Sequence, residues 1–468
     1  MPENRFQDPY QYVIREGIIS HSRNSKIQRI DIGPSIAEME FYESIDSLGV
    51  YGTVTFADTS RVMEIIDFQG TELFELSVAI DTNAQPLKRL FRIVNIISGQ
   101  KTTDQSEVFI LSLVDAHSYL NTCTKLARTY TGKPSDIIQT ILNDNFLGEK
   151  KLIYNPQRVE IQEAIKYISP HLQPFEVIKL MANRATGPNG TPFYCWGVFA
   201  DDHLRYGDLH DLLSFPALFE NVPLKYNAKF TQDLALNPDE QGLHISHLQY
   251  DDQENALKMV KNGNVGATYD YLDTSGGYTN SIFFDIKTMI ENTFAGTPGL
   301  GGAETSHPNF DTSPIIGGVP IHQTNARQFS SIASTFVYND YPSYAEDQTS
   351  NYHRAKFTQK AMRELLRKST IKITVPGRRF FPGTKPGNKA FNMTIGNKIN
   401  VAIADNASVS DDQSAPFKKD QKRSGPYLVL QGKHHFVLDK YSVSMELGKL
   451  SSPEGNVPLP SVLGTGAR

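Results

Sequence analysis

GVYGTVTFADTSRVMEIIDFQGTELFELSV, residues 49–78, holds two strand patterns with a short helical pattern between them. Apolar and polar residues alternate in 51–58, which is typical of a half-buried strand. Residues 59–68 predict a short helix with Thr59 or Ser60 as its cap. Alternation then returns, so the stretch predicts strand, helix and strand within a β-rich unit.

The same order of strands returns near the C-terminus, in GNKINVAIAD (396–405) and GPYLVLQGKHHFVLDKYSVSMEL (425–447). Gly70 and Gly396 each precede a strand whose first apolar residue lies three positions later, at Leu73 and Ile399. Aromatic-led strands follow in both copies. The pattern indicates two similar β-domains and favours a ring or tube of subunits, in which strand edges pair between neighbours. An ordinary two-domain β protein with similar hairpins is the alternative.

The composition is that of a globular chain. The 468 residues suggest roughly two to four domains at about 150 residues each. A net charge of −5 argues against broad binding to a phosphate backbone, which needs a basic surface. Two cysteines make no disulfide framework, and Cys195 in PFYCWGVF predicts a buried thiol. The N-terminal residues lack a signal-peptide pattern, and no apolar run reaches the length of a membrane span.

Patterning along the chain predicts an α+β fold that is mainly β. Helices are expected at 134–147 and 172–186, before a hairpin at 191–209, and a further helix is expected at 350–369. Residues 262–349 are rich in Gly, Pro, Ser and Thr and predict an irregular insertion. The predicted division is 1–120, a first β-domain with an N-terminal arm; 121–221, a small α+β middle domain; 222–261 and 365–450, a second β-domain; 262–364, the insertion with a helix at its end; and 451–468, a flexible tail.

These segments resemble a known family. LGVYGTVTFADTSRVMEIIDFQGTELFELSVAI resembles the first tube domain of baseplate hub proteins from contractile-tailed bacteriophages. PSDIIQTILND and QPFEVIKLMANRA are similar to that family's middle domain, and IKITVPGRRFFPGTKPGN with the final hairpin resembles its second tube domain. The hub part of type VI secretion spike proteins shares this layout. The order of elements, over most of 25–260 and 365–450, carries the match.

The resemblance implies a structural virion protein located in the tail baseplate and assembled in the host cytoplasm. It implies a homotrimer whose six tube domains form a pseudo-sixfold ring between the tail tube and the central spike. Tail-tube or tube-initiator proteins, the spike and surrounding wedge proteins would be its partners. DNA would only pass through the lumen, which we expect to be acidic or neutral and polar. Neither membrane insertion nor enzymatic activity is implied.

Candidate chemical residues give no catalytic, cofactor or metal site. Lys133 in YTGKPS lacks the glycine spacing of a phosphate-binding loop. His434 and His435 are strand neighbours and should point to opposite faces, as should His244 and His247, so convergent metal ligation is not expected. The triplet 201–203, Asp-Asp-His, predicts a turn.

Two other functions remain open at this stage. One is a tail-associated enzyme that degrades the cell wall, with its site inside 262–350. The other is a tail adhesin that uses the same insertion. The basic run 417–423 predicts a solvated loop tip or a docking site for an acidic neighbour.

Overall fold

The computed structural model describes residues 8–23, 26–66, 68–103, 106–145, 151–154, 160, 165–187, 190–219, 222–226, 242–251, 256–273, 278–294, 307–308, 310–333, 357–385, 389–404, 419–420 and 423–452. Within these ranges the chain is mainly antiparallel β, with a smaller share of helix, which confirms the predicted fold class. None of the helices in these ranges has the length and apolar character that crossing a bilayer requires.

The N-terminal part forms the first half-sheet, in the spatial order β3-β4-β7-β6-β5-β1-β2. Its elements are β1 (Val13–Arg23), β2 (Lys26–Asp31), β3 (Ile36–Ser44), β4 (Tyr51–Asp58), α1 (Val62–Ile65), β5 (Leu73–Ala79), β6 (Leu87–Thr103) and β7 (Ser106–Asp115). The strand, helix and strand predicted for 49–78 are therefore β4, α1 and β5.

The predicted cap of α1 at Thr59 or Ser60 is wrong. Asp58 at the end of β4 accepts hydrogen bonds from the backbone nitrogens of Val62 and Met63, at 2.9 Å each. A carboxylate has two acceptor oxygens, so one side chain satisfies both unpaired amides of the first turn.

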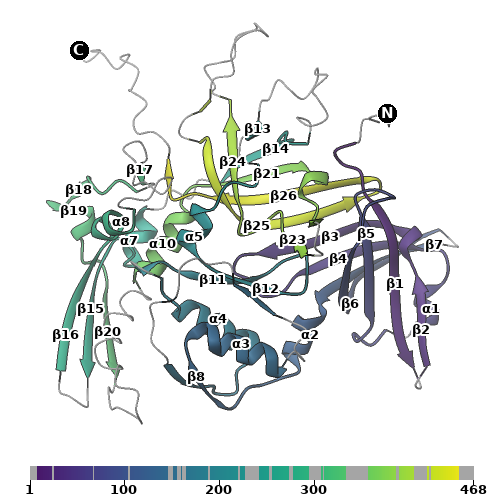
Figure 1. Cartoon of the computed structure of the whole chain (residues 1–468), viewed down its shortest axis with the longest axis horizontal. Helices are drawn as coiled ribbons and strands as arrows, with labels where there is room; N and C mark the ends of the chain where they lie inside the picture. Colours follow the sequence, from purple (N-terminus) through teal and green to yellow (C-terminus); the bar gives the residue numbers. More distant parts are fainter. Residues whose placement is uncertain are drawn as a thin grey trace, which may run out of the picture.

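The second half-sheet is built from two separated stretches of the chain. Its strands are β13 (Leu224–Tyr226), β14 (His247–Asp251), β21 (Thr370–Pro376), β24 (Lys398–Ile403), β25 (Gly425–Val437) and β26 (Lys440–Gly448). They follow the order β14-β21-β26-β25-β24-β13, and β25 also pairs with β3. The two half-sheets are thus joined edge to edge into one continuous sheet (Figure 1).

The half-sheets are copies of one arrangement. Strands β3, β4, β7, β6 and β5 of the first match β14, β21, β26, β25 and β24 of the second in spatial order. The next strand differs, because β1 is antiparallel to β5 whereas β13 is parallel to β24. Both copies carry a bulge at the same place, between Ile93 and Asn95 in β6 and between Val429 and Gln431 in β25. The duplication predicted from the sequence is therefore present in the fold.

The match of Leu73 with Ile399 is off by one residue. Leu73 pairs with Arg92, two positions before Val94, and Lys398 pairs with Leu428, two positions before Leu430. Lys398 is therefore the equivalent of Leu73. The apolar pattern misled the comparison because the equivalent position in the second copy is a half-exposed lysine.

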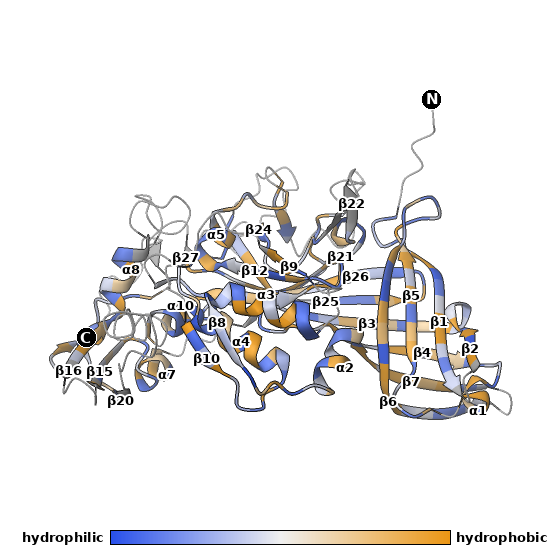
Figure 2. Cartoon of the chain, turned by 60° about the horizontal axis from the view of Figure 1, so that its bottom comes forward, coloured by the Kyte–Doolittle hydropathy of each residue, from blue (hydrophilic) through white to orange (hydrophobic). Residues whose placement is uncertain are grey.

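Alternating side chains give the sheet one apolar face and one polar face, visible as bands along the strands in Figure 2. The apolar face forms the main core of the chain. Phe41 of β3 lies at its centre, stacked against Phe91 of β6 at 4.9 Å and against Phe199 at 4.8 Å between ring centroids. The core therefore runs without a break across the two half-sheets and into the middle domain.

The middle domain confirms the predicted helices and hairpin. Its elements are α2 (Ala116–Thr122), β8 (Thr129–Gly132), α3 (Pro134–Asn145), β9 (Leu152–Tyr154), β10 (Ile165–Ile168), α4 (Pro174–Arg184), β11 (Phe193–Gly197), β12 (Leu204–Asp208) and α5 (Leu209–Ser214). The apolar stripes of α3 and α4 pack together in a second core, separate from the main one.

Because β14 and β21 are neighbours in the sheet, everything between them is inserted. We call its described elements the inserted arm: α7 (Ala256–Lys261), β15 (Gly266–Asp273), β16 (Tyr278–Asp285), α8 (Ile286–Phe294), β17 (His307–Pro308), β18 (Ile315–Ile316), β19 (Val319–Pro320), β20 (Gln328–Ala333) and α10 (Gln359–Leu366). Strands β15, β16 and β20 form a three-stranded sheet at the end of the molecule opposite β1 and β2 (Figure 1).

The expectation of an irregular insertion is wrong for this sheet. Its strands carry Tyr269, Phe284 and Phe329, whose rings pack around Phe357 shortly before α10. These aromatic side chains provide a local core that the Gly- and Pro-rich composition does not reveal. Three short strands complete the fold: β22 (Gly383–Lys385), β23 (Lys389–Phe391) and β27 (Ser451–Ser452), the last pairing with β17.

Candidate functional site

The face of the sheet opposite the main core is polar along the line where the half-sheets join. On β21, β26, β25, β3 and β4 the partly exposed residues include Lys372, Thr374, Ser442, Ser444, Glu446, Gln431, Lys433, His435, Glu38, Glu40, Tyr42, Ser44, Thr53 and Thr55. Three glutamates and two lysines leave this set weakly acidic. We call it the polar face.

Charges on the polar face are paired across the junction of the half-sheets. Lys433 of β25 lies 2.5 Å from Glu40 of β3, and His435 Nε2 lies 2.6 Å from Glu38 Oε1. Burial alone would raise the pKa of Glu40, but hydrogen bonds from Lys433 and Tyr42 lower it below its usual range. Glu40 therefore stays ionised, and the junction presents little unpaired charge.

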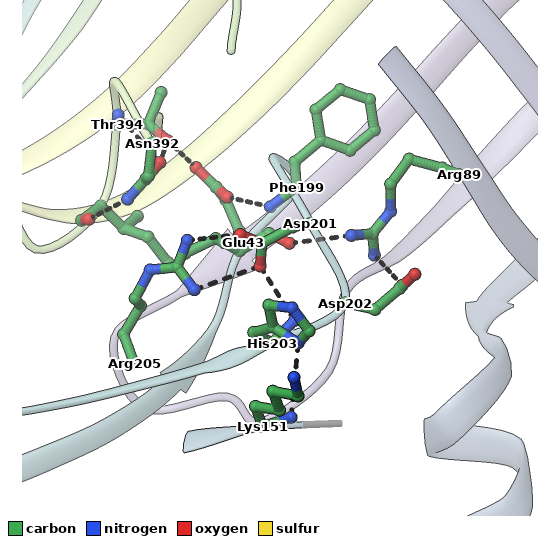
Figure 3. A network of polar contacts seen from close by, with 12 residues as sticks. Glu43, Arg89, Lys151, Phe199, Asp201, Asp202, His203, Arg205, Asn392 and Thr394 are labelled. Carbon is green, nitrogen blue, oxygen red and sulfur yellow. Dashed lines mark hydrogen bonds and ion pairs between the residues drawn. The ribbon is translucent and has the colours of Figure 1, made fainter. Parts of the chain in front are cut away.

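The opposite side of the same junction holds a buried polar cluster. Glu43 of β3 accepts a hydrogen bond from the backbone nitrogen of Phe199 at 2.7 Å and another from the hydroxyl of Thr394. Its Oε1 lies 3.3 Å from Nε2 of His434, whose Nδ1 lies 2.8 Å from the Tyr441 hydroxyl. The first half-sheet, the second half-sheet and the middle domain meet at this cluster (Figure 3).

A second ionic contact ties the first half-sheet to the hairpin of the middle domain. Arg89 of β6 is 3% exposed and lies 3.7 Å from Asp115 at the end of β7 and 3.2 Å from Asp202. Its guanidinium also donates to the carbonyl of Val198 at 3.5 Å. In Figure 3 Arg89 and Glu43 approach the loop after β11 from two directions. The loop 198–203 is therefore held by the first half-sheet at two places, through Glu43 of β3 and Arg89 of β6.

The turn predicted at 201–203 is confirmed, and its acidic residues have partners that the sequence did not indicate. Asp201 accepts two hydrogen bonds from the guanidinium of Arg205, at 2.6 and 3.1 Å. Asp202 reaches Arg89, which is more than 100 residues away in the chain. Arg89 stands at a position that the alternation in β6 assigns to the buried face. This was the signal available in the sequence, since an isolated buried charge needs a counter-ion.

Other residues singled out in the sequence lie apart from each other. His434 and His435 point to opposite faces, as predicted, and His434 is fully buried. His247 begins β14, whereas His244 lies before it and forms an isolated bridge with Lys225. Cys195 is a buried thiol, and Lys133 precedes α3 as a helix start. Most of the basic run 417–423 lies outside the described residues.

Within the described part of the chain, two clusters have the geometry to hold a metal ion, and both contain a competing cation. Glu38, Glu40 and His435 bring ligand atoms within 4.8 Å of one another, but Lys433 already pairs with Glu40. The second cluster brings ligand atoms of Asp115, His117 and Asp202 within the same distance of one another, and the guanidinium of Arg89 pairs with its two aspartates. A fixed cation beside the carboxylates repels a metal ion, so we assign both clusters to ion pairing.

The inserted arm contains a histidine and carboxylate pair of catalytic type. Nδ1 of His322 lies 3.1 Å from each carboxylate oxygen of Asp285. Asp285 also accepts a hydrogen bond from the backbone nitrogen of Lys287, in the first turn of α8. Asp285 therefore caps the start of α8, and His322 holds its carboxylate in place, which explains the pair structurally.

Comparisons with known proteins find similarity to solved structures. No family model matches the chain, and no curated protein matches it. Among solved structures, it is similar to a tail protein from Neisseria meningitidis MC58, with 12% identity, a TM-score of 0.48, and coverage of 94% of this chain and 96% of that one.

It is also similar to the prophage MuSo2 43 kDa tail protein from Shewanella oneidensis, with 9% identity, a TM-score of 0.45 and coverage of 92% and 98%. A third similar structure is the E. coli c3393 protein, a component of the type VI secretion system, with 10% identity, a TM-score of 0.39 and coverage of 96% and 79%. These three structures are described as two tail proteins and one component of the type VI secretion system.

Proposed function

We propose that this protein is a structural, non-enzymatic hub of a contractile tail baseplate. Three copies would close a ring of six equivalent half-sheets around a channel, between the tail tube and the central spike. The polar face would line the channel and let DNA pass. The observation that carries this proposal is the pairing of β25 with β3, which joins the half-sheets edge to edge inside one chain. Among the described residues, the equivalent edges, those of β6 and β14, have no strand beside them.

The pairing inside the chain shows which edges fit each other. The first part of β25 pairs with β24, and its later part, from Gln431 to Val437, extends past β24 and pairs with β3. A long strand in one half-sheet thus receives the edge strand of the other.

The equivalent long strand in the first half-sheet is β6. Its first part, from Leu87 to Arg92, pairs with β5, and the rest extends past β5. Among the described residues no strand lies on that outer edge of β6, nor on the outer edge of β14, which is the equivalent of β3. The same chain therefore carries an open receiving edge and an open donating edge.

The ladders specify how these edges would pair between two copies. Inside the chain His434 lies opposite Phe41. Gly99 is the equivalent of His434, because each lies opposite the equivalent residue of β7 or β26. Tyr250 is the equivalent of Phe41, because each lies opposite the equivalent residue of β21 or β4. We therefore place Tyr250 of one copy opposite Gly99 of the next.

Exposure supports this pairing. Phe41 is fully buried at the junction inside the chain, whereas its equivalent Tyr250 is 39% exposed. On the opposite edge, Ile96 and Ile97 of β6 are 38% and 54% exposed. An open strand edge with exposed apolar side chains is a template for pairing with another chain. A head-to-tail contact of this kind generates a closed ring when its rotation closes.

The number of copies and the partners follow from the resemblance to baseplate hubs. Three copies of two half-sheets give six units, which match a hexameric tail tube on one side and a threefold spike on the other. The tail baseplate of a virion, assembled in the host cytoplasm, would be the location. Wedge proteins would surround the ring.

Solution mass tests the proposal. We expect the purified chain, alone or with its spike partner, to have three times the mass of one chain by light scattering. Tyr250→Asp should give monomers, since it places a charge at the centre of the paired edge. Leu272→Asp on β15 is the control, because Leu272 is 38% exposed and lies away from both edges. A monomeric wild type in both conditions would contradict the ring.

A further inference from the structure

The chain segment that follows β3 closes one end of the junction inside the molecule. The backbone nitrogen of Ile45 donates to the carbonyl of Leu430 at 2.9 Å, and Leu430 is the bulge residue of β25. Leu430 and Ile45 are each 1% exposed, and both belong to the main core. The turn after β3 therefore covers the bulge of the strand that receives β3.

The equivalent bulge in the first half-sheet lies at Val94 of β6. Two and three positions later lie Ile96 and Ile97, which are exposed apolar residues of this strand. Among the described residues, no segment donates a backbone hydrogen bond to this bulge from a position equivalent to Ile45. Among the residues that the structure describes, the receiving strand of the proposed interface thus has no cover of the kind that β25 has.

The segment that follows β14, the equivalent of β3, is the start of the inserted arm, and its first described element is α7. This helix has a buried side and an exposed apolar side. Met259 is 4% exposed and belongs to the main core, whereas Leu257 is 64% exposed. The helix is thus held in place by Met259 and presents Leu257 outward.

We infer that α7 of one copy covers the β6 bulge of the next copy, with Leu257 packed on Ile96 and Ile97. The occupant is a second copy of this chain, because the strand before α7 is the one that would pair with β6. This inference depends on the proposed ring. It assigns the inserted arm a role between subunits, as a substitute for the short turn between β3 and β4.

Two variants of matched exposure test the contact. Leu257→Asp should weaken the association of copies by roughly 10- to 100-fold, as expected for losing the burial of one leucine. Ile168→Asp on β10 of the middle domain is the control, because Ile168 is 68% exposed and remote from the junction. Mass photometry over a dilution series gives both dissociation constants, and thermal melts check that the variants fold.

A crosslink between separate chains tests the geometry directly. In a Cys123→Ser background, a Leu257→Cys chain is mixed with an Ile97→Cys chain and oxidised. We expect a disulfide-linked pair of different chains, and none when Ile168→Cys replaces Leu257→Cys.

The outcomes separate this inference from the ring itself. A trimeric wild type that loses association through Tyr250→Asp, but neither crosslinks nor responds to Leu257→Asp, would overturn the contact and leave the ring in place. A monomeric wild type would overturn both.

Discussion

Oε1 of Glu43 lies 3.3 Å from Nε2 of His434, and neither side chain has any exposed surface. The two residues belong to different half-sheets, and the pair sits where those sheets meet the loop of the middle domain that contains Phe199. Outside, on the polar face of the same two strands, Glu38 and His435 form a second pair that is partly exposed. One junction thus offers a buried pair and a matched exposed pair.

We expect Glu43→Gln to lower the free energy of unfolding by about 2 to 4 kcal/mol. Glu43 is a buried acceptor for several donors, and changing one member of a buried, hydrogen-bonded cluster is far costlier than losing an exposed pair. Urea denaturation would measure this difference.

Glu38→Gln is the matched control and should cost less than about 1 kcal/mol, because exposed pairs contribute little. Equal effects of the two substitutions would show that the junction does not depend on the buried pair.

Stability should fall on acidification because of Glu43. Burial alone would raise its pKa, but the neighbouring charge of His434 and the hydrogen bonds from His434, Thr394 and Phe199 hold the pKa below the usual 4.5. A carboxyl group with a lowered pKa stabilises the fold above its unfolded pKa, and this contribution is lost as the pH falls through the folded value.

Thermal melts of wild type and Glu43→Gln across the acidic range check this prediction. The difference in melting temperature between wild type and Glu43→Gln should be largest near neutral pH and should become smaller as the pH drops below about 4.5. A gap that stays constant down to the acid limit would mean that Glu43 does not titrate in the folded state.

Substituting alanine for the equivalent glycine should destabilise the second copy of the repeat more than the first. Gly70 and Gly396 both have left-handed backbones, with φ of 79° and 75°. An added Cβ at Gly396 would lie 2.5 Å from the Trp196 ring, whereas at Gly70 the nearest atom is the Val94 carbonyl oxygen at 3.0 Å. We expect Gly396→Ala to cost about 3 kcal/mol or more, and Gly70→Ala about 1 to 2 kcal/mol.

Gly317→Ala measures the stability cost of backbone strain without the cost of crowding an added Cβ. Gly317 has φ of 62° and no atom within 4 Å of an added Cβ. Its substitution should therefore cost only the backbone term, about 1 kcal/mol. Equal losses at Gly317 and Gly396 in thermal denaturation would exclude crowding against Trp196 as the cause.

The sequence by itself determined the local elements and their order. Alternation predicted β4 and β5, the apolar stripes predicted α3 and α4, and the recurrence of strands predicted the two half-sheets. These features depend on neighbours within a few positions, which a single sequence displays directly. The opposite faces of His434 and His435 followed from the same rule.

Only the tertiary structure decided which edges meet. The pairing of β25 with β3 joins residues almost 400 positions apart, and no local pattern encodes it. The partners of Glu43 and Arg89 lie on three separate parts of the chain, so the sequence showed their charges without their counter-charges. The sheet of the inserted arm was missed because its core is made by a few aromatic residues spread over a long Gly- and Pro-rich segment. Periodicity specifies the face that a strand buries, whereas long-range packing and electrostatics select its neighbours.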